Sequence, residues 1–493
     1  MHYPGEAIQV MRLDTLIKDM SVINIKGSRD MEITGITKDS RAVGEGYMFF
    51  ATGRSGTYMD DALKRGARAI VTDKEPERPF DCVIIVEDVA ASLGDAASTF
   101  YGFPSKQMNI AGITGTNGKT TTTYLIESIL EHAGKKAGVI GTISYRYDGK
   151  ALKAENTTPG AAETHSLLKD MHLAGVTFVV MEVSSHALDQ KRVEGIDFDI
   201  GIFTNLTHDH LDYHGDLERY KGAKRLLFEH YLKKSSKEQK FAILNIDDPS
   251  TRDFIIAAPT RTLSYSTKGY ADAHLLGYRE DIDGLQLDVS LMGKKVALTS
   301  PMTGVFNASN ILAACLYGHV TGIPYADIEK GIEKLEGVPG RLERIRNQKG
   351  LSVFVDYAHT PDALGNVLAL LNRLKKGRLI VVFGCGGDRD IAKRSIMGSI
   401  AAHLADLTII TSDNPRTEDP ENIIEDIKKG FNNKPFRAIG DRKEAIHEAI
   451  KAAQENDVVL VAGKGHEDYQ LIGDRILHFS DREVIEEFLN VAS

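Results

Sequence analysis

Short runs of consecutive apolar and β-branched residues, each followed by a turn and a helical segment, constrain the fold of this chain more than any other feature. The runs are residues 69–72, 83–86, 178–181, 200–203, 353–355, 379–383, 407–410 and 458–461. Apolar runs without polar alternation are typical of strands covered on both faces, as in parallel sheets. The helical segments between them are the crossovers that parallel strands need. The sequence therefore predicts an α/β protein built from βαβ units.

Two breaks divide this pattern. A chain of 493 residues is long enough for about three domains. The first break is Tyr101–Ser105, and the second is Gly337–Gly340, where glycines and a proline interrupt a helical segment. We therefore expect three α/β domains, over residues 1–104, 105–339 and 340–493. Because ligands of open α/β sheets bind at the carboxyl ends of strands, the polar motifs that follow the runs are the candidate sites.

Charge and composition exclude several classes of protein. The chain has 60 Lys and Arg against 69 Asp and Glu, a net charge of −9, which disfavours a general nucleic-acid binder but permits a local basic cleft. We expect no transmembrane helix and no secretion signal, because the apolar runs are short and residues 1–20 lack an apolar core. Cys82, Cys315 and Cys385 form no CxxC pair and suit buried thiols in a reducing compartment. We expect a cytoplasmic monomer that acts on small molecules and binds neither nucleic acid nor membrane.

A glycine-rich loop gives the strongest local signal. Residues 112–121 read GITGTNGKTT, after the apolar run 108–113 and before an amphipathic helix expected to end at Gly134. Such a loop at a helix N-terminus presents backbone N–H groups to phosphates. Lys119 would reach the β- and γ-phosphates, and the Thr120 hydroxyl would bind Mg²⁺. The strict pattern has glycine in place of Ile113, so the loop is a variant. The predicted ATP-binding residues here are Gly115, Thr116, Asn117, Gly118, Lys119, Thr120 and Thr121.

A carboxylate and a histidine-rich turn follow two further strands. Glu182 ends the run 178–183, and we expect it to bind the same Mg²⁺, a cation that prefers oxygen ligands; the alternative is a solvated strand end. His208, His210 and His214 match no standard zinc spacing, and no cysteine is near. We expect His210 to complete a second Mg²⁺ site or to orient phosphate. A polar surface turn is the alternative, above all for the other two histidines.

Several motifs occur in one order along the chain: GITGTNGKTT, MEVSSH (181–186), TNLTHDHLDYHG (204–215), GVFNASN (304–310), GRLE (340–343) and VDYAHTP (355–361). Together they resemble the Mur ligase family, over nearly the whole chain. The resemblance implies a UDP-sugar-binding N-terminal domain, a central P-loop-type ATPase domain and a C-terminal Rossmann-like domain that binds an amino acid.

The resemblance also implies a reaction, ATP-dependent amide-bond formation in cytoplasmic peptidoglycan synthesis. ATP would phosphorylate the γ-carboxylate of D-Glu in UDP-N-acetylmuramoyl-L-alanyl-D-glutamate. The amine of a diamino acid would then displace phosphate and give the UDP-muramoyl-tripeptide and ADP. The resemblance assigns Arg341 to the γ-phosphate, and Asn307 and Asp356 to adenine and ribose. The catalytic residues would be Lys119, Glu182, His210, Lys224 and Arg341.

Lys224 has two opposite interpretations. As a residue of an amphipathic helix, it would be a solvated charge. By the resemblance, CO₂ converts its amine to a carbamate that binds the second Mg²⁺ beside His210. Only a neutral amine reacts with CO₂, so in that case we expect Lys224 to be partly desolvated and its pKa to be lowered.

The resemblance assigns the remaining substrate contacts. The UDP-muramoyl-dipeptide would meet Ser40, Arg41, Asn156, Thr157, Thr158, Ser184, Gln190 and Arg192. The family usually has an Asp-Gly pair after the glycine-rich turn of its first domain, whereas this chain does not have it in residues 53–61. Uridine contacts within Gly53–Gly56 are therefore left open.

The motif Asp413–Arg416, DNPR, looks like the version that uses meso-diaminopimelate. This diamino acid has a second carboxylate, which an arginine can bind with two hydrogen bonds, whereas lysine would bring a like charge to Arg416. Arg389 is a second candidate for that carboxylate, and Glu467 could bind an ammonium group. The alternative for Arg416 is a loop arginine paired with Glu418 or Asp419. The predicted diaminopimelate-binding residues are Arg389, Asp413, Asn414, Pro415, Arg416, Gly463 and Glu467.

Three other functions stay open at this point. One is the same ligation with L-lysine. A second is folylpolyglutamate or cyanophycin-type ligation, which residues 39–41 of the first domain disfavour. A third, of a different class, is a P-loop nucleotide switch, which would leave the C-terminal motifs unexplained.

Overall fold

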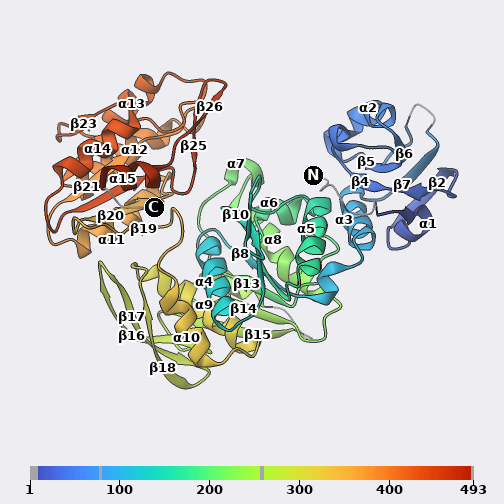
Figure 1. Cartoon of the computed structure of the whole chain (residues 1–493), viewed down its shortest axis with the longest axis horizontal. Coiled ribbons are helices and arrows are strands. Elements are labelled where there is room, and N and C mark those ends of the chain that lie inside the picture. The colour runs from blue at the N-terminus through green and yellow to red at the C-terminus, as the bar shows by residue number, and fades with distance from the viewer. Residues whose placement is uncertain (1–8, 77–79, 256–259, 490–493) are drawn as a thin grey trace. The chain divides into compact units, whose positions relative to one another are not determined.

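The computed structural model describes residues 9–76, 80–255 and 260–489 (Figure 1). It divides the chain into two compact units. The N-terminal unit comprises Met1–His274, Ser290–Lys294 and Ser309–Gly331, and the C-terminal unit comprises Leu275–Val289, Lys295–Ala308 and Ile332–Ser493. The predicted three-way division at residues 104 and 339 stays a prediction.

The N-terminal unit begins with a five-stranded sheet in the order β2-β7-β6-β5-β4. Its strands are β2 (Val22–Gly27), β4 (Gly35–Thr37), β5 (Tyr47–Phe50), β6 (Ala67–Thr72) and β7 (Cys82–Val86). Strands β4 to β7 run parallel, and β2 pairs antiparallel with β7. Around this sheet lie β1 (Met11–Arg12), α1 (Leu13–Leu16), β3 (Glu32–Ile33), η1 (Ser40–Ala42), η2 (Gly53–Tyr58), α2 (Met59–Lys64) and α3 (Val89–Phe100). The predicted runs 69–72 and 83–86 are thus confirmed as strands.

A second sheet of the same unit has a parallel core in the order β9-β12-β8-β13-β14-β15. Its strands are β8 (Asn109–Thr114), β9 (Ala137–Ile140), β12 (Phe178–Glu182), β13 (Ile200–Phe203), β14 (Phe241–Asn245) and β15 (Arg261–Ser266). The connecting elements are η3 (Pro104–Gln107), α4 (Lys119–His132), α5 (Ala161–Leu173), α6 (Ser185–Asp189), α7 (Leu211–His214), α8 (Leu217–Leu226), the π-helical η4 (Leu227–Leu232) and η5 (Pro249–Phe254). Because Ile113 lies opposite Glu182 in the β8–β12 pair, the start of the glycine loop and the strand-end carboxylate are neighbours.

The C-terminal unit contains a six-stranded sheet in the order β19-β20-β24-β21-β22-β23, parallel except for β19. The strands are β19 (Glu343–Ile345), β20 (Ser352–Asp356), β21 (Leu379–Phe383), β22 (Leu407–Ile410), β23 (Arg437–Ala438) and β24 (Val458–Ala462), and the helices are α11 (Pro361–Leu374), α12 (Ala392–Leu404), α13 (Pro420–Lys428), α14 (Arg442–Ala452) and α15 (Asp481–Leu489). Separate buried clusters cover the two faces, with α11, α12 and α13 in one and α14 and α15 in the other. Each predicted apolar run of this region forms a strand buried on both faces.

Several strands escape prediction because they are not continuous apolar runs. They are β10 (Ser144–Tyr147), β11 (Lys150–Lys153), β16 (Ala273–Asp281), β17 (Gly284–Leu291), β18 (Lys294–Ser300), β25 (Tyr469–Ile472) and β26 (Arg475–His478). In most of β17, buried and exposed residues alternate, as expected of a half-buried strand. Met292 and Gly293, both at positive φ, form the two-residue turn between β17 and β18. The remaining helices are α9 (Phe306–Val320) and α10 (Tyr325–Lys334).

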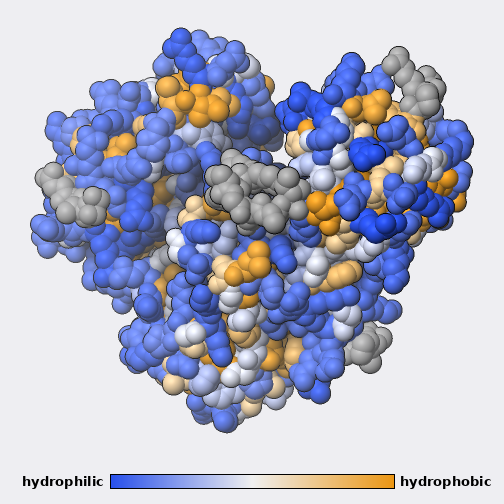
Figure 2. Space-filling model, turned by 45° about the vertical axis from the view of Figure 1, so that its right-hand side comes forward, coloured by the Kyte–Doolittle hydropathy of each residue, from blue (hydrophilic) through white to orange (hydrophobic). Residues whose placement is uncertain are grey.

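On the face drawn in Figure 2, hydrophilic residues predominate and hydrophobic residues gather in separate patches. Within residues 9–76, 80–255 and 260–489, no helix combines the length and the apolar character that a membrane span requires.

Candidate active site

The glycine loop joins β8 to α4, as the sequence predicts. Gly115 lies at φ +148°, and a Cβ atom there would stand 1.9 Å from the Thr204 hydroxyl oxygen. Only glycine therefore fits this position. The Asn117 N–H donates to the side chain of Asn205 over 2.9 Å, and the Thr204 hydroxyl donates to Asn117 O over 2.6 Å. The residues after β13 thus fix the shape of the loop.

Two lysines donate to one carbonyl oxygen of this loop. Lys119 Nζ donates to Gly115 O and Thr116 O, each over 2.9 Å. Lys224 Nζ also donates to Gly115 O over 2.9 Å. Its side chain is 1% exposed, and burial, followed by the charge of Lys119, holds its pKa well below the usual value. The expected desolvation of Lys224 is confirmed, and the solvated-charge interpretation is wrong.

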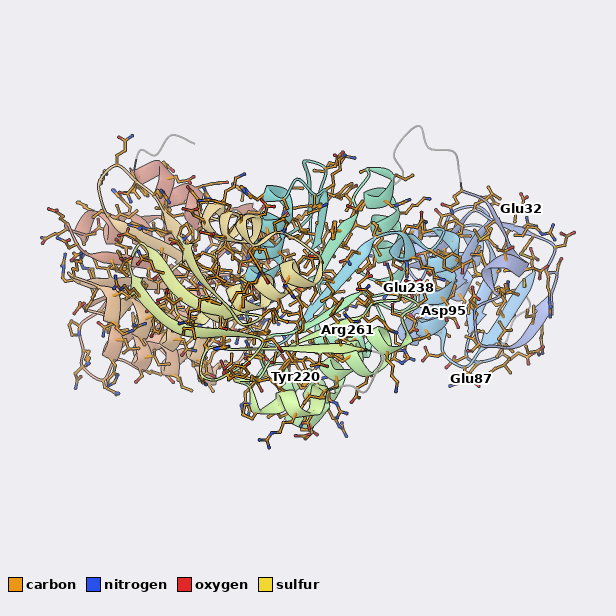
Figure 3. The ribbon with its side chains drawn as sticks, turned by 90° about the horizontal axis from the view of Figure 1, so that it is seen from below. Glu32, Glu87, Asp95, Tyr220, Glu238 and Arg261 are labelled. Atoms are coloured by element: carbon orange, nitrogen blue, oxygen red, sulfur yellow. The ribbon has the colours of Figure 1, made fainter. Side chains whose placement is uncertain are left out.

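Tyr220, labelled in Figure 3, packs against the same lysine. Its ring centre lies 4.3 Å from Lys224 Nζ, and its hydroxyl lies 3.1 Å from Thr116 Oγ1. Tyr220 and Lys224 are one helical turn apart on α8, so the aromatic ring covers the amine. Sequence reasoning missed Tyr220, although the (i, i+4) spacing on a helix could have signalled it.

Glu182 is a buried carboxylate beside the loop. It is 1% exposed, and it accepts hydrogen bonds from Thr120 Oγ1 over 3.1 Å, Thr142 N over 2.9 Å and Thr142 Oγ1 over 3.0 Å. The alternative of a solvated strand end is therefore wrong. Thr142 was not predicted, although it lies just beyond β9, the strand next to β12.

The donor set suits Mg²⁺. The Thr120 hydroxyl and the Glu182 carboxylate are hard oxygen donors, and they already touch. In the described part of the chain, no three His, Cys, Asp or Glu side chains gather as a metal site. Mg²⁺ commonly binds one or two carboxylates together with phosphate oxygens and water rather than an all-protein cage. The residues present therefore fit a magnesium ion that arrives with a nucleotide.

The three histidines of the turn have different environments. His210 lies at φ +52°, and about half of its side chain is exposed. Its ring packs edge-on against His186, with centroids 4.8 Å apart. His214 is buried beside Ser185 Oγ at 3.0 Å, and burial lowers its pKa, whereas His208 is exposed. The three histidines thus differ in exposure, and the rings of His210 and His214 both pack against His186.

Residues predicted to bind the dipeptide end form a hydrogen-bonded group after β12. Thr158 Oγ1 donates to Glu182 O over 2.8 Å and accepts from Ser184 N over 3.1 Å. Arg192 Nη1 donates to Thr158 O over 3.0 Å, and Arg192 Nη2 donates to Gln190 Oε1 over 2.7 Å. The structure therefore brings four of the predicted residues together beside Glu182.

The other residues of that prediction are more dispersed. Thr157 Oγ1 lies 3.0 Å from Thr142 Oγ1 and so adjoins Glu182. Asn156 O accepts from the Tyr145 hydroxyl over 2.7 Å. Arg41 is paired with Asp39 on the exposed turn η1 of the first sheet, and Ser40 is buried there. Gly53–Gly56 lie in η2, and the side chains of residues 54–56 fall outside the described structure.

The residues that the resemblance assigns to nucleotide and phosphate in the C-terminal unit have defined surroundings. Asp356 accepts from Leu342 N over 2.6 Å and Ala358 N over 2.8 Å, and burial raises its pKa to about 6. The Arg341 guanidinium lies 5.0 Å from the ring centre of Tyr357, and its buried Nε has no partner among the described residues. Asn307 Nδ2 donates to Thr303 O over 2.8 Å.

Three loops converge after β21, β22 and β24 in the C-terminal unit. Arg416 Nη1 donates to Gly387 O over 2.7 Å, and Gly387 N donates to Asn414 O over 2.9 Å. Asn414 Nδ2 in turn donates to Glu467 Oε2 over 2.9 Å. A Cβ atom on Gly387 would stand 1.9 Å from Pro415 O, so the loops approach closely. We call the part of these loops that carries Gly387, Asn414, Arg416 and Glu467 the rim. It contains both the guanidinium and the carboxylate predicted to bind the two ends of an amino acid.

Neighbours of this rim refine the prediction. Glu418 pairs with Arg394 over 2.8 Å, so the alternative that ties Arg416 to Glu418 is not what the structure shows. Arg389 is exposed on the loop after β21. Lys464, which sequence reasoning missed, is fully buried and lies 3.4 Å from Glu467. Its position in the motif GKGHE, between the predicted binding residues Gly463 and Glu467, was the available signal in the sequence.

Comparisons with known proteins agree with this arrangement. Residues 113–318 match the Mur ligase middle domain, and residues 340–465 match the Mur ligase glutamate ligase domain. The chain belongs to the Mur ligase family. The first match contains the glycine loop, Glu182 and Lys224, and the second contains Arg341 and the rim residues from Arg389 to Gly463. As a Mur ligase, the protein is an ATP-dependent ligase.

Individual relatives resemble this Mur ligase over almost its full length. The UDP-N-acetylmuramoyl-L-alanyl-D-glutamate--2,6-diaminopimelate ligase of Clostridium tetani is 42% identical, over 97% of this chain and 99% of the relative. The protein of the same name from Solibacter usitatus is 44% identical over 93% and 94%. A solved structure with that name superimposes with a TM-score of 0.72 at 33% identity, over 98% and 99% of the two chains.

Proposed function

We propose that this Mur ligase joins meso-2,6-diaminopimelate to the D-Glu γ-carboxylate of UDP-N-acetylmuramoyl-L-alanyl-D-glutamate, in the cytoplasmic synthesis of peptidoglycan. The observation that carries the proposal is the rim on which Arg416 and Glu467 are joined through Asn414 and Gly387. A guanidinium suits the distal carboxylate of the substrate, and a carboxylate suits its ammonium group. The names of the relatives support the same substrates.

The first half of the proposed reaction is phosphoryl transfer. The γ-carboxylate oxygen attacks the γ-phosphorus of ATP, the bond to ADP breaks, and an acyl phosphate forms. Two like unit charges 4 Å apart repel by about 4 kcal/mol at an effective dielectric constant near 20. Lys119 and Arg341 reduce this repulsion, and Mg²⁺ held by Thr120 and Glu182 adds charge neutralisation when bound.

The second half is amide formation. The unprotonated amine of the diamino acid attacks the acyl carbon, and inorganic phosphate leaves as the amide forms and a proton is lost. Arg416, with Arg389 beside it, binds the distal carboxylate, and Glu467 binds an ammonium group. Asn307 and Asp356 hold adenine and ribose, and Ser40, Arg41 and the group around Thr158 hold the UDP-muramoyl-dipeptide.

We further propose that Lys224 reacts with CO₂ to form a carbamate that, with His210, binds a second Mg²⁺. The support is the buried amine with its lowered pKa, because only the neutral form attacks CO₂. Addition of the neutral amine to CO₂ releases a proton. The carbamate would thus replace a neutral amine beside Lys119 with an anion, which suits the binding of a metal ion. We also propose that the enzyme acts as a cytoplasmic monomer.

The test is an amino-acid panel with the purified chain, ATP, Mg²⁺ and the UDP-muramoyl-dipeptide. We expect phosphate release and a new amide product with meso-diaminopimelate, little of either with L-lysine, and none without the dipeptide. Phosphate release that is independent of the amino acid would instead indicate a nucleotide switch. Equal turnover with lysine would contradict the proposed specificity.

A further inference from the structure

A completely buried ion pair lies beneath the rim of the C-terminal unit. Arg442, the first residue of α14, donates from Nε to Asp481 Oδ1 and from Nη2 to Asp481 Oδ2, each over 2.7 Å. Asp481 is the first residue of α15, and both side chains are 0% exposed. A buried charge needs a partner and further hydrogen bonds to offset its loss of hydration, and this arginine has both.

Arg442 also donates to two backbone carbonyl groups, each of which directly precedes a loop of the rim. Arg442 Nη2 donates to Ala462 O over 3.0 Å, and Nη1 donates to Ser412 O over 3.3 Å. Ala462 ends β24 directly before Gly463, and Ser412 directly precedes Asp413. One rigid guanidinium therefore joins the starts of the loops that carry Arg416 and Glu467.

The charge of Arg442 also acts on the rim. Burial alone lowers the pKa of Arg442, but Asp481, Asp413 and Glu467 together raise it above the usual value. The guanidinium thus attracts two carboxylates from the predicted amino-acid site as well as its own partner.

We infer that Arg442 and Asp481 are positioning residues for the incoming amino acid: they fix the separation of the loops that hold its two ends. The inference rests on the proposed function, because it takes the rim to be the diaminopimelate site. A planar guanidinium donates in several fixed directions at once, whereas the ammonium of a lysine is a point charge that cannot reproduce them. The pair would therefore act on amino-acid binding rather than on ATP or the dipeptide.

The chain offers a matched control at the opposite edge of the same sheet. Arg378 pairs with Asp457 over 2.7 Å, and these residues directly precede β21 and β24. This pair holds the amino ends of strands whose carboxyl ends carry the rim. It is also an arginine–aspartate pair, but it has no connection to the loops and its Arg378 side chain is 44% exposed.

The experiment compares Arg442→Lys and Arg378→Lys by steady-state kinetics, with each substrate varied in turn. For Arg442→Lys we expect KM for meso-diaminopimelate to rise at least tenfold, while KM for ATP and for the UDP-muramoyl-dipeptide stays within twofold. Arg378→Lys should leave all three constants within twofold. A merely structural role would lower the amount of active enzyme, and so the apparent kcat, without a selective change in one KM.

A second variant covers failure of Arg442→Lys to fold. Arg442→Met combined with Asp481→Leu removes both charges, a change that is often close to neutral for stability, and it should raise the same KM. An unchanged KM for diaminopimelate in a folded variant, or an equal rise in Arg378→Lys, would overturn the inference. Wild-type enzyme that does not use diaminopimelate would instead refute the proposed function, on which the inference rests.

Discussion

Replacement of Arg416 tests the amino-acid specificity most directly. Arg416 lies at φ +53°, a left-handed conformation that asparagine tolerates better than alanine does, so Arg416→Asn removes the guanidinium with little backbone strain. In the described chain, the only side-chain hydrogen bond of Arg416 runs from Nη1 to Gly387 O, which leaves Nε and Nη2 for a carboxylate. Two charge-assisted hydrogen bonds contribute about 3–6 kcal/mol, of which the asparagine amide recovers about 1. The remainder, about 2–5 kcal/mol, predicts that kcat/KM for meso-diaminopimelate falls roughly 30- to 4,000-fold.

The assay measures phosphate release with meso-diaminopimelate and with L-lysine for the wild type, Arg416→Asn and Arg416→Lys. The lysine variant keeps the positive charge but not the pair of parallel N–H donors, so it should recover only part of the loss. Lysine as a substrate should gain or stay unchanged in Arg416→Asn, because a like charge is removed. Equal losses with both amino acids would refute the assignment of Arg416 to the distal carboxylate.

Three further predictions concern the N-terminal unit. Lys119→Ala should abolish substrate-dependent ADP formation in a coupled assay, because the phosphates lose their lysine; retained ADP formation would contradict its role. Lys224→Met should lose most ligation activity, and bicarbonate should not restore it. The variant should nevertheless melt at a higher temperature at neutral pH, because folding lowers the pKa of Lys224 and the unfolded chain therefore binds a proton that the native state does not. A lower melting temperature would contradict this reasoning. Burial lowers the pKa of His165 from 6.5 to about 4. Between these pH values the unfolded state binds more protons than the native state, so the free energy of unfolding falls by about 3 kcal/mol as the pH drops through them. Denaturant titrations from pH 7 to pH 4 should show a smaller fall in the free energy of unfolding for His165→Gln than for the wild type, and an equal fall would contradict the assignment.

The sequence predicts much of the framework because its signals are local. A strand with no polar alternation, a glycine loop and a helix start are each encoded within a few residues, and β8, the loop and α4 follow that pattern. Glu182 could be placed near the loop because strand ends in parallel sheets meet at one edge. The family resemblance added Lys224, whose burial helical periodicity alone would not suggest.

The contacts that escaped prediction depend on strand order and on helix packing. Thr142 reaches Glu182 because β9 pairs with β12, and neither residue alone indicates which strand is its neighbour. Arg442 and Asp481 come together from two helices 39 residues apart, and each side chain taken alone resembles an ordinary exposed charge at a helix start. Fully buried ion pairs of this kind become visible only when the packing of the helices is known.

Gly115 O accepts from both Lys119 and Lys224, and this acceptor is part of the main chain. A substitution can remove the amine of Lys119 or of Lys224, but no change of side chain removes the backbone oxygen of Gly115 that accepts from both. Mutation can therefore change either lysine or displace the backbone, but it cannot remove the acceptor that the two lysines share.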